Sequence, residues 1–450
     1  MRELAKSRLY LHRPCSMMVT LFEITGNVDL DHFKVALASA MNRHEQLKSK
    51  ITIKGDGEAF YEPIPRANVK LKVETYEPAE DDDVESLMDI AFEWAEEAVT
   101  FSLNLSEGEL MRHILLSDGV KAVWGIASHY LAGDAPSIQY LARDVFALLD
   151  DSSLKLAPPE WRAPENEEVL NVDALAWPAK FKVKRMNKIW QREGKSFTWP
   201  DLERMQKNFH EAYPLYILHE SLEAEFTDAL RQLAHDHKLR FSMLFAAAYL
   251  KATADKEAVS LLLSTRPEGY EGVGTYQGGI SIDVSKMREH DLLEIAKMLS
   301  DKTDEAIQKP EQVHHSAIVL LGMDENLIDS AYYFAYDGYK AKSAEMMAQL
   351  YGLTRVGSGT QINNMTVIPA EEEYAFGRIT QVYVIPPLAP NFSRSISLST
   401  VSGRLGIVVN FYLDEAYENF LLKKVISMLR EAAGLPEAEA AEDTEDIYEE

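Results

Sequence analysis

The chain has 450 residues and a formal charge of −26 at pH 7, with 46% hydrophobic and 26% charged residues. This composition is typical of a soluble globular protein, and the length favours two domains of about 200 residues each. The acidic balance argues against nucleic-acid binding, which needs a positive surface. The single cysteine, Cys15, excludes an internal disulfide and a cysteine-rich metal site, so we expect no metal. No signal segment or membrane span is evident, which predicts a cytoplasmic protein.

The first 150 residues combine strand and helix patterns. Strands are predicted over 16–26, 49–55 and 70–76, and helices over 29–44, 83–99 and 137–149. Residues 108–128 read as a β-hairpin that turns at Asp118-Gly119. The stretch "SHYLAGD" lies between this hairpin and the third helix, where a lone histidine precedes a glycine-aspartate turn. We predict an N-terminal α+β half over 1–150.

Residues 151–214 differ in character, because prolines and tryptophans interrupt them and only one helix is predicted, over 201–212. The mixed pattern then resumes. Strands are predicted over 215–222, 258–264, 376–386, 394–401 and 404–411, and helices over 222–238, 241–254, 291–308, 343–352 and 414–433. The crossover 151–214 therefore leads into a C-terminal α+β half over 215–434. The acidic tail 435–450 contains no basic residue and is predicted to be disordered.

Five stretches, in order, resemble the condensation domains of nonribosomal peptide synthetases, which belong to the chloramphenicol-acetyltransferase-like (CAT-like) acyltransferases. They include "RHEQL" at 43–47, "FSLNLSEGELMR" at 101–112 and "SHYLAGD" at 128–134. The other two are "STRPEGYEGVGTYQGG" at 264–279 and "SGRLGIVVNFYLDEAYENF" at 402–420. The resemblance covers roughly residues 15–432. It implies two CAT-like α/β sandwich halves arranged as a V, with a tunnel between them.

The resemblance also implies a site at the place of the family's His-His-x-x-x-Asp-Gly motif. Aligned on the histidines, Ser128 replaces the first and His129 is the second, which the family uses in catalysis. Gly133 and Asp134 then invert the Asp-Gly pair. Neutral imidazole suits proton transfer near pH 7, so His129 is the predicted catalytic base and Asp134 its motif acid.

The motif acid of the family pairs with an arginine from the second half, and Arg266 stands at the matching place. An Asp134–Arg266 pair, with Ser128 and Gly133 shaping the loop, is therefore one hypothesis. The other is that Asp134 caps the helix that begins with Ala135 and Pro136, and we expect one short carboxylate to serve only one of these roles. The sequence leaves the choice open.

Two further groups of residues are candidates for substrate contacts. The resemblance places Asn363 and Asn364 on the acceptor side of the pocket. A basic run at 180–192, containing Lys182, Lys184 and Arg185, offers a site for the phosphate of a phosphopantetheine arm or of CoA on an otherwise acidic chain. An ordinary basic surface helix explains the same run.

Two functions follow from the resemblance. One is a free-standing, monomeric acyltransferase that moves an acyl group from a carrier-protein or CoA thioester to an amine or hydroxyl of a small acceptor. It would hold no permanent cofactor, since the thioester is a co-substrate. The other is a catalytically silent condensation-like domain that binds a carrier protein or another partner. The altered motif keeps both open.

Overall fold

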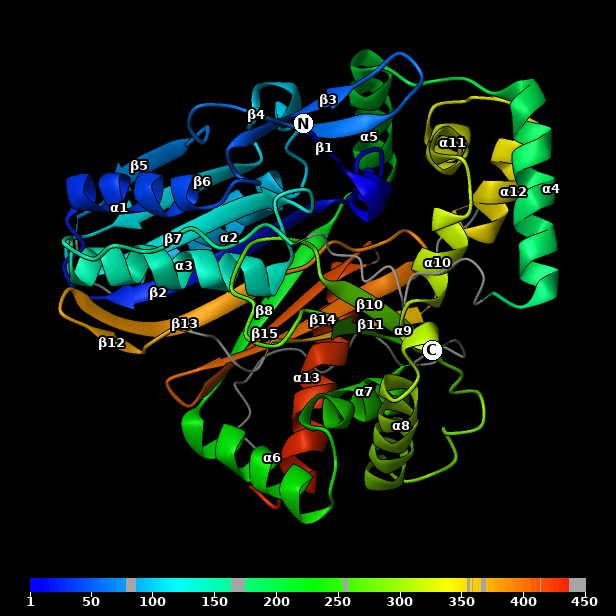
Figure 1. The fold of residues 1–450 in the computed structure, drawn as a ribbon. Coiled ribbons are helices and arrows are strands. Elements are labelled where there is room, and N and C mark those ends of the chain that lie inside the picture. Colours follow the sequence, from blue (N-terminus) through cyan, green and yellow to red (C-terminus); the bar gives the residue numbers. More distant parts are fainter. Residues whose placement is uncertain are drawn as a thin grey trace.

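The computed structural model describes residues 1–77, 86–162, 175–253, 258–353, 357, 359–365, 370–412 and 414–436. It contains two six-stranded sheets, each covered by helices, and a smaller three-stranded sheet (Figure 1). This confirms the predicted fold class of two α+β halves. Almost all of the predicted disordered tail over 435–450 lies outside the described residues. None of the described helices is both long and apolar enough to cross a bilayer.

The N-terminal sheet has the strand order β12-β13-β2-β7-β6-β5. Helices α1 and α3 lie side by side over one face of it (Figure 1). The small sheet β1-β4-β3 completes this half. The bounds are β1 Arg2–Glu3, β2 Met17–Thr25, β3 Ser49–Ile53, β4 Ala59–Pro63, β5 Leu71–Thr75, β6 Met111–Ser117, β7 Lys121–His129, β12 Glu373–Tyr374, β13 Gly377–Ile385, α1 Leu30–Arg43, α2 Leu87–Ala98 and α3 Ala135–Asp150, with 3-10 turns η1 Ala5–Tyr10 and η2 Leu105–Glu107.

The C-terminal sheet has the order β10-β9-β11-β14-β15-β8. Helix α7 is apolar on all sides, and its central residues are buried in the core of this half, which explains why its sequence shows no helical stripe. The bounds are β8 Tyr216–Leu222, β9 Val259–Ser264, β10 Gln277–Ile282, β11 Gly359–Met365, β14 Phe392–Val401, β15 Arg404–Phe411, α6 Ala224–Asp236, α7 Phe241–Ala252, α8 Leu292–Ile307 and α13 Glu415–Ala432.

Strand β13 corrects the predicted domain boundaries. The prediction assigned residues 376–386 to the C-terminal half, yet β13 pairs with β2 in the N-terminal sheet, with Arg378 opposite Thr25. Its residues Ile379, Val382 and Val384 are buried in the N-terminal core. The two halves are therefore not separate stretches of chain, because a late segment completes the first sheet.

A third apolar core lies outside both sheets. It consists mainly of helices and is called the helical cluster below. The crossover supplies two of these helices, and residues 315–350 supply the rest, on the side of the molecule where α4, α11 and α12 are labelled in Figure 1. Buried Met186, Trp190 and Tyr333 are among its members. The bounds are α4 Trp177–Glu193, α5 Trp199–Ala212, α9 Pro310–Val313, α10 His315–Leu321, α11 Glu325–Tyr336 and α12 Lys342–Leu350.

Candidate functional site

The motif loop begins where β7 ends. Strand β2 pairs with β7 along its length, and Met17 stands opposite His129. Ser128 is fully buried in the sheet, and its hydroxyl donates to the Met18 carbonyl at 3.5 Å. The backbone N–H of Tyr130 donates to the Ser16 carbonyl at 2.9 Å, so strand pairing continues into the loop. The central strands thus fix the backbone of the motif.

The His129 ring is buried, with 3% of the residue exposed. Its Nδ1 accepts a hydrogen bond from the Leu131 backbone N–H at 3.0 Å, and its Nε2 has no hydrogen-bond partner among the described residues. A neutral ring that accepts at Nδ1 carries its proton on Nε2. Burial lowers the pKa of His129 to about 3. At neutral pH, the ring therefore has no free nitrogen on which to accept another proton.

Asp134 joins the two halves of the molecule. Its Oδ1 accepts from the Arg266 guanidinium at 2.8 Å, and both side chains are less than a tenth exposed. Its Oδ2 accepts from the backbone N–H of Tyr276 at 2.7 Å. Arg266 also donates to the Gly272 carbonyl at 2.6 Å. The carboxylate thereby fixes the loop between β9 and β10 against the start of α3.

The same carboxylate caps α3, which corrects the expectation that it would serve only one role. The backbone N–H and the hydroxyl of Ser137 both donate to Asp134 Oδ1, at 3.0 and 2.6 Å. A carboxylate accepts several hydrogen bonds at once, so capping and pairing coexist. The loop therefore keeps the anchor that the resemblance attributes to the motif acid.

Gly133 is held in a place where a side chain does not fit. A Cβ atom there would lie 2.6 Å from the Ser137 Cβ and 3.2 Å from the Gly274 nitrogen. Because one of these neighbours is backbone of the opposite half, it has little room to move. Gly133 lets the two halves approach closely beside the Asp134 anchor.

A cavity of about 430 Å³ lies between the halves. Its walls come from the N-terminal segment, from the sheet strands β9 and β10, and from residues of the helical cluster. Tyr130 lines this cavity, whereas His129 is not among the lining residues. The expectation of His129 at the floor of a tunnel is therefore wrong, because the strand directs this ring into the core and leaves the next side chain facing the cavity.

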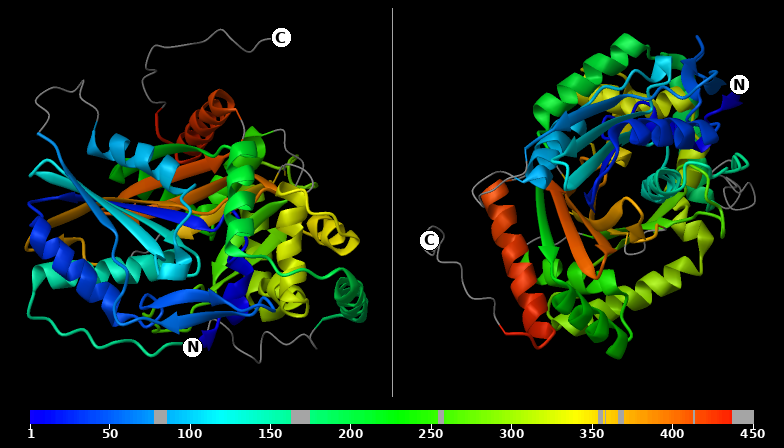
Figure 2. Two further views of the ribbon diagram at one scale, coloured as in Figure 1. Left: turned by 90° about the horizontal axis from the view of Figure 1, so that it is seen from above. Right: turned by 90° about the vertical axis from the view of Figure 1, so that its left-hand side faces the viewer.

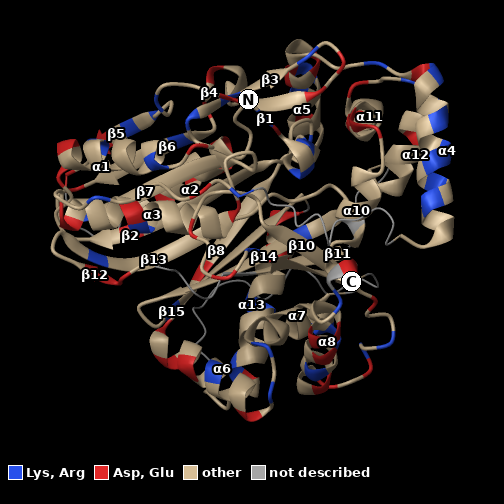
Figure 3. Ribbon diagram, viewed as in Figure 1, with Lys and Arg blue, Asp and Glu red and all other residues tan. Residues whose placement is uncertain are grey.

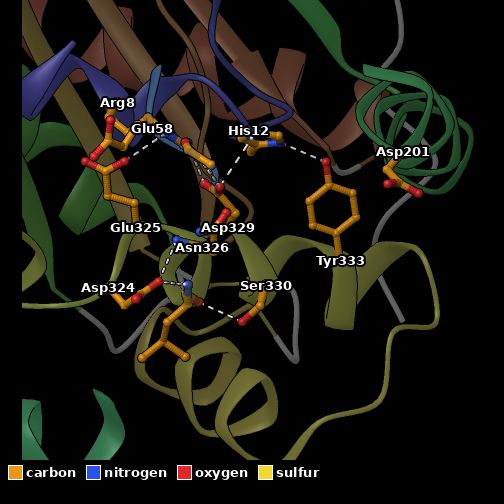
Figure 4. Close-up of polar contacts among 12 residues, drawn as sticks. Arg8, His12, Glu58, Asp201, Asp324, Glu325, Asn326, Asp329, Ser330 and Tyr333 are labelled. Carbon is orange, nitrogen blue, oxygen red and sulfur yellow. Dashed lines mark hydrogen bonds and ion pairs between the residues drawn. The ribbon is translucent and has the colours of Figure 1, made fainter. Parts of the chain in front are cut away.

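The N-terminal segment is attached to helix α11 by buried polar contacts (Figure 4). The Arg8 guanidinium donates to both oxygens of Asp329, at 2.9 and 2.5 Å. His12 Nδ1 lies 2.7 Å from the Tyr333 hydroxyl. These contacts hold η1 and the residues that follow it against the helical cluster. Tyr10 and Arg13, on the same segment, line the cavity.

The remaining predicted residues lie elsewhere. Asn363 is 1% exposed and donates to the Ser395 hydroxyl at 2.7 Å, so it belongs to the sheet interior and not to the pocket wall. Gln361, two residues earlier on β11, lines the cavity instead. The Asn364 side chain lies outside the described part of the chain. Within that part, no group of three potential metal ligands comes together.

The basic run forms the exposed face of α4. Lys182, Lys184 and Arg185 are exposed, while the neighbouring Val183 and Met186 are buried in the helical cluster. Figure 3 shows the row of basic residues along the outside of α4. None of these three cations lines the cavity, and helices α10 and α12 pack against α4 from the inner side. A phosphate site on this run stays a prediction.

Comparison with known proteins identifies the family of this chain. A sequence-family match to the Condensation domain covers residues 4–253, more than half of the chain. The chain belongs to the condensation-domain family. A comparison with curated protein sequences found no match. The family assignment confirms the resemblance drawn from the five sequence stretches.

Solved structures agree on the fold. The first condensation domain of the calcium-dependent antibiotic synthetase, in complex with a substrate analogue, is 15% identical, with a TM-score of 0.65 and 98% of each chain covered. The condensation domain of the Monacolin K polyketide synthase MokA is 14% identical (TM-score 0.64, 96% of this chain and 97% of that one). Polyketide synthase associated protein 5 from Mycobacterium tuberculosis is 13% identical (TM-score 0.59, 96% and 98%). At these identities the likeness shows the fold alone.

The anchor at Asp134 changes the alignment of the condensation-domain motif. Asp134 makes the arginine pair expected of the motif aspartate, so it occupies the aspartate position and not the glycine position. Counting back, His129 takes the first histidine position and Tyr130 the second, and Ala135 follows in place of glycine. Alignment on the aspartate, whose helix cap was already recognisable, would have found Tyr130 from the sequence.

Proposed function

We propose that this condensation-domain protein binds a small ligand in the cavity between its halves, in partnership with a carrier protein, and does not catalyse histidine-dependent acyl transfer. The observation that carries the proposal is that Tyr130, and not a histidine, presents its side chain to the cavity. This is the catalytically silent alternative of the two functions that the sequence left open. The intact Asp134–Arg266 anchor supports it, because the loop around the cavity keeps its shape without the base.

Neither side chain at the motif suits general base catalysis. Burial raises the pKa of the Tyr130 phenol, so the hydroxyl remains protonated at neutral pH and acts as a hydrogen-bond donor. His129 carries its proton on Nε2 and lies outside the cavity. An amine or hydroxyl acceptor that attacks a thioester needs a group that takes its proton. The cavity holds a ligand more readily than it activates one.

The test measures turnover and binding on the same purified full chain. Acyl-CoA and acyl-carrier thioesters are offered with amine and alcohol acceptors, and carrier binding is followed by calorimetry. We expect binding of a carrier protein, no thioester turnover above the uncatalysed rate, and no effect of His129→Asn. Asn keeps an oxygen to accept the Leu131 N–H. The exposed residue His235 provides the matched control, His235→Asn.

Tyr130→His adds a gain-of-function arm, because it places an imidazole at the cavity wall. We expect it to introduce slow acyl transfer that the wild type lacks. Turnover by the wild type that His129→Asn abolishes, at an unchanged melting temperature, would establish the acyltransferase function instead. Failure of every carrier protein to bind would contradict the partner part of the proposal.

A further inference from the structure

The cavity between the halves has cationic side chains in its wall, although the chain as a whole carries −26. Among the described residues that line it are two cations, Lys6 and Arg13, and no aspartate or glutamate. Lys6 is only 2% exposed, and its Nζ donates to the Gln277 carbonyl at 3.0 Å. A wall of this charge favours an anion over a neutral or cationic ligand.

Arg13 is the cation with unused hydrogen-bonding capacity. Its Nε donates to the Cys15 sulfur at 3.2 Å. Among the described residues, its two terminal nitrogens have no hydrogen-bond partner. No carboxylate oxygen of these residues lies within 4 Å of the Arg13 guanidinium nitrogens, the distance that defines an ion pair. A half-buried guanidinium without a counter-charge is costly, and its planar fork matches the two oxygens of a carboxylate. The geometry around Arg13 is that of an anion receptor.

The rest of the wall suits an apolar or aromatic body. Tyr332 and Tyr351 stack with ring centroids 5.9 Å apart and an interplanar angle of 12°. Tyr10 meets Tyr130 edge to face at 5.2 Å. All four rings line the cavity, together with leucines, and about 430 Å³ is enough for a small organic molecule. The ligand would place its charged end at Arg13 and its body along these rings.

We propose that this cavity binds a small carboxylic acid with an apolar or aromatic body, its free carboxylate held by Arg13. This inference rests on the proposed ligand-binding function and names the class of ligand. Arg8 and Asp329 anchor the N-terminal segment to α11 (Figure 4). This anchoring keeps the Arg13 guanidinium, on the same segment, in place.

Calorimetric titration of the full chain tests the proposal. The probes are 4-phenylbutyrate and octanoate, the neutral primary amide of each, and phenethyl phosphate. Charge-assisted hydrogen bonds predict that each carboxylate binds at least about tenfold more tightly than its amide. Arg13→Gln is expected to remove this preference, while Arg13→Lys retains most of it. The matched control is Arg231→Gln, which removes an exposed cation on α6 and is expected to leave the preference intact.

Melting temperatures of all variants show that they remain folded, and Arg13→Lys keeps the test valid if Arg13→Gln unfolds. Equal binding of carboxylate and amide, tighter binding of the phosphate, or no binding of either carboxylate would overturn the proposal. None of these readouts depends on thioester turnover. A chain that proves to be an acyltransferase yet prefers the carboxylates would contradict the proposed function and leave this inference standing.

Discussion

The Asp134 carboxylate accepts a hydrogen bond from the Arg266 guanidinium at 2.8 Å, across the boundary between the two halves, while it also caps helix α3. One residue therefore fixes both the loop that carries Tyr130 and the opposing loop between β9 and β10. The pair is almost fully shielded from water. Asp134 also accepts from the Tyr276 N–H and Arg266 also donates to the Gly272 carbonyl, and these bonds offset part of the cost of burying the charges.

Breaking this pair is expected to destabilise the protein strongly. Asp134→Asn or Arg266→Met leaves the other group buried without its partner, which costs about 3–5 kcal/mol of unfolding free energy. Urea denaturation of the wild type, the two single variants and the double variant forms a double-mutant cycle. The cycle gives the interaction energy between the two side chains. We expect about 1–3 kcal/mol of interaction energy, because the side chains are in direct contact.

The same cycle on Lys54 and Glu58 provides a control. These exposed side chains form an i,i+4 ion pair at 2.9 Å. Exposed ion pairs contribute about 0.2–1 kcal/mol. A coupling between Asp134 and Arg266 no larger than that of the exposed pair would show that the two halves are held together by other contacts.

Gly133→Ala is expected to weaken the junction between the halves. The added Cβ would contact Ser137 and the Gly274 backbone at 3.2 Å or less, and such overpacking costs about 1–3 kcal/mol. Gly55→Ala is the matched control, since no atom lies within 4 Å of a Cβ there. Thermal unfolding measures both. Equal melting temperatures for the two variants would contradict the close approach at Gly133.

Stability is expected to fall as the solution is acidified below pH 6.5. Burial lowers the pKa of His113 and His129 to about 3, and that of His12 and His210 to about 4. Each is neutral in the folded chain between its lowered pKa and about 6.5, whereas the unfolded chain binds a proton there. The unfolded state therefore binds more protons, and acid favours it.

His113→Phe isolates one of these contributions. In the described part of the chain, neither ring nitrogen of His113 has a hydrogen-bond partner, and the ring stacks on Trp124, so an aromatic replacement retains the packing. The loss of unfolding free energy between pH 7 and pH 5 is expected to shrink by about 2 kcal/mol. Urea midpoints at the two pH values measure it, with the exposed His235→Gln as control. An unchanged pH dependence in His113→Phe would mean that this ring is not buried in a neutral state.

Charge reversal of the α4 run tests the predicted phosphate site. Changing Lys182, Lys184 and Arg185 to glutamate is expected to weaken binding of a carrier protein that bears phosphopantetheine about tenfold or more at low salt, because the exposed cations of the run would attract its phosphate. Binding of 4-phenylbutyrate in the cavity is expected to remain within about twofold, since none of the three lines it. Melting temperature and carrier affinity are compared with those of Lys207→Glu, an exposed cation on α5. An unchanged carrier affinity would assign the run to an ordinary solvated helix face.

Much of the fold was predictable from periodicity and family resemblance. The hairpin of β6 and β7 and the amphipathic helix α1, capped by Asp29, follow directly from the sequence. Helix α11 was missed, because its buried tyrosines face several neighbours and give no simple stripe. The placement of β13 was also missed, since a strand pattern specifies an element but not the sheet that it joins.

The site was predicted less well than the fold, for reasons of geometry. Asp134 and Arg266 were correctly brought together, because their residue types and separation matched the family. His129 was placed at the cavity because it was aligned with the family's catalytic histidine, whereas the direction of a side chain alternates along a strand and is settled by its neighbours. Moving the motif alignment by one residue replaces His129, whose ring is buried, with Tyr130, which lines the cavity.

The position of β13 has a consequence for how this chain is made. Thr380 and Glu23, which lie 357 positions apart, share a hydrogen bond at the β2–β13 edge. During synthesis, one edge of β2 stays unpaired until β13 has left the ribosome. Unpaired edges of this kind pair readily with other strands. A fragment that ends before β13 leaves this edge of β2 unpaired, so we expect it to aggregate more readily than the full chain.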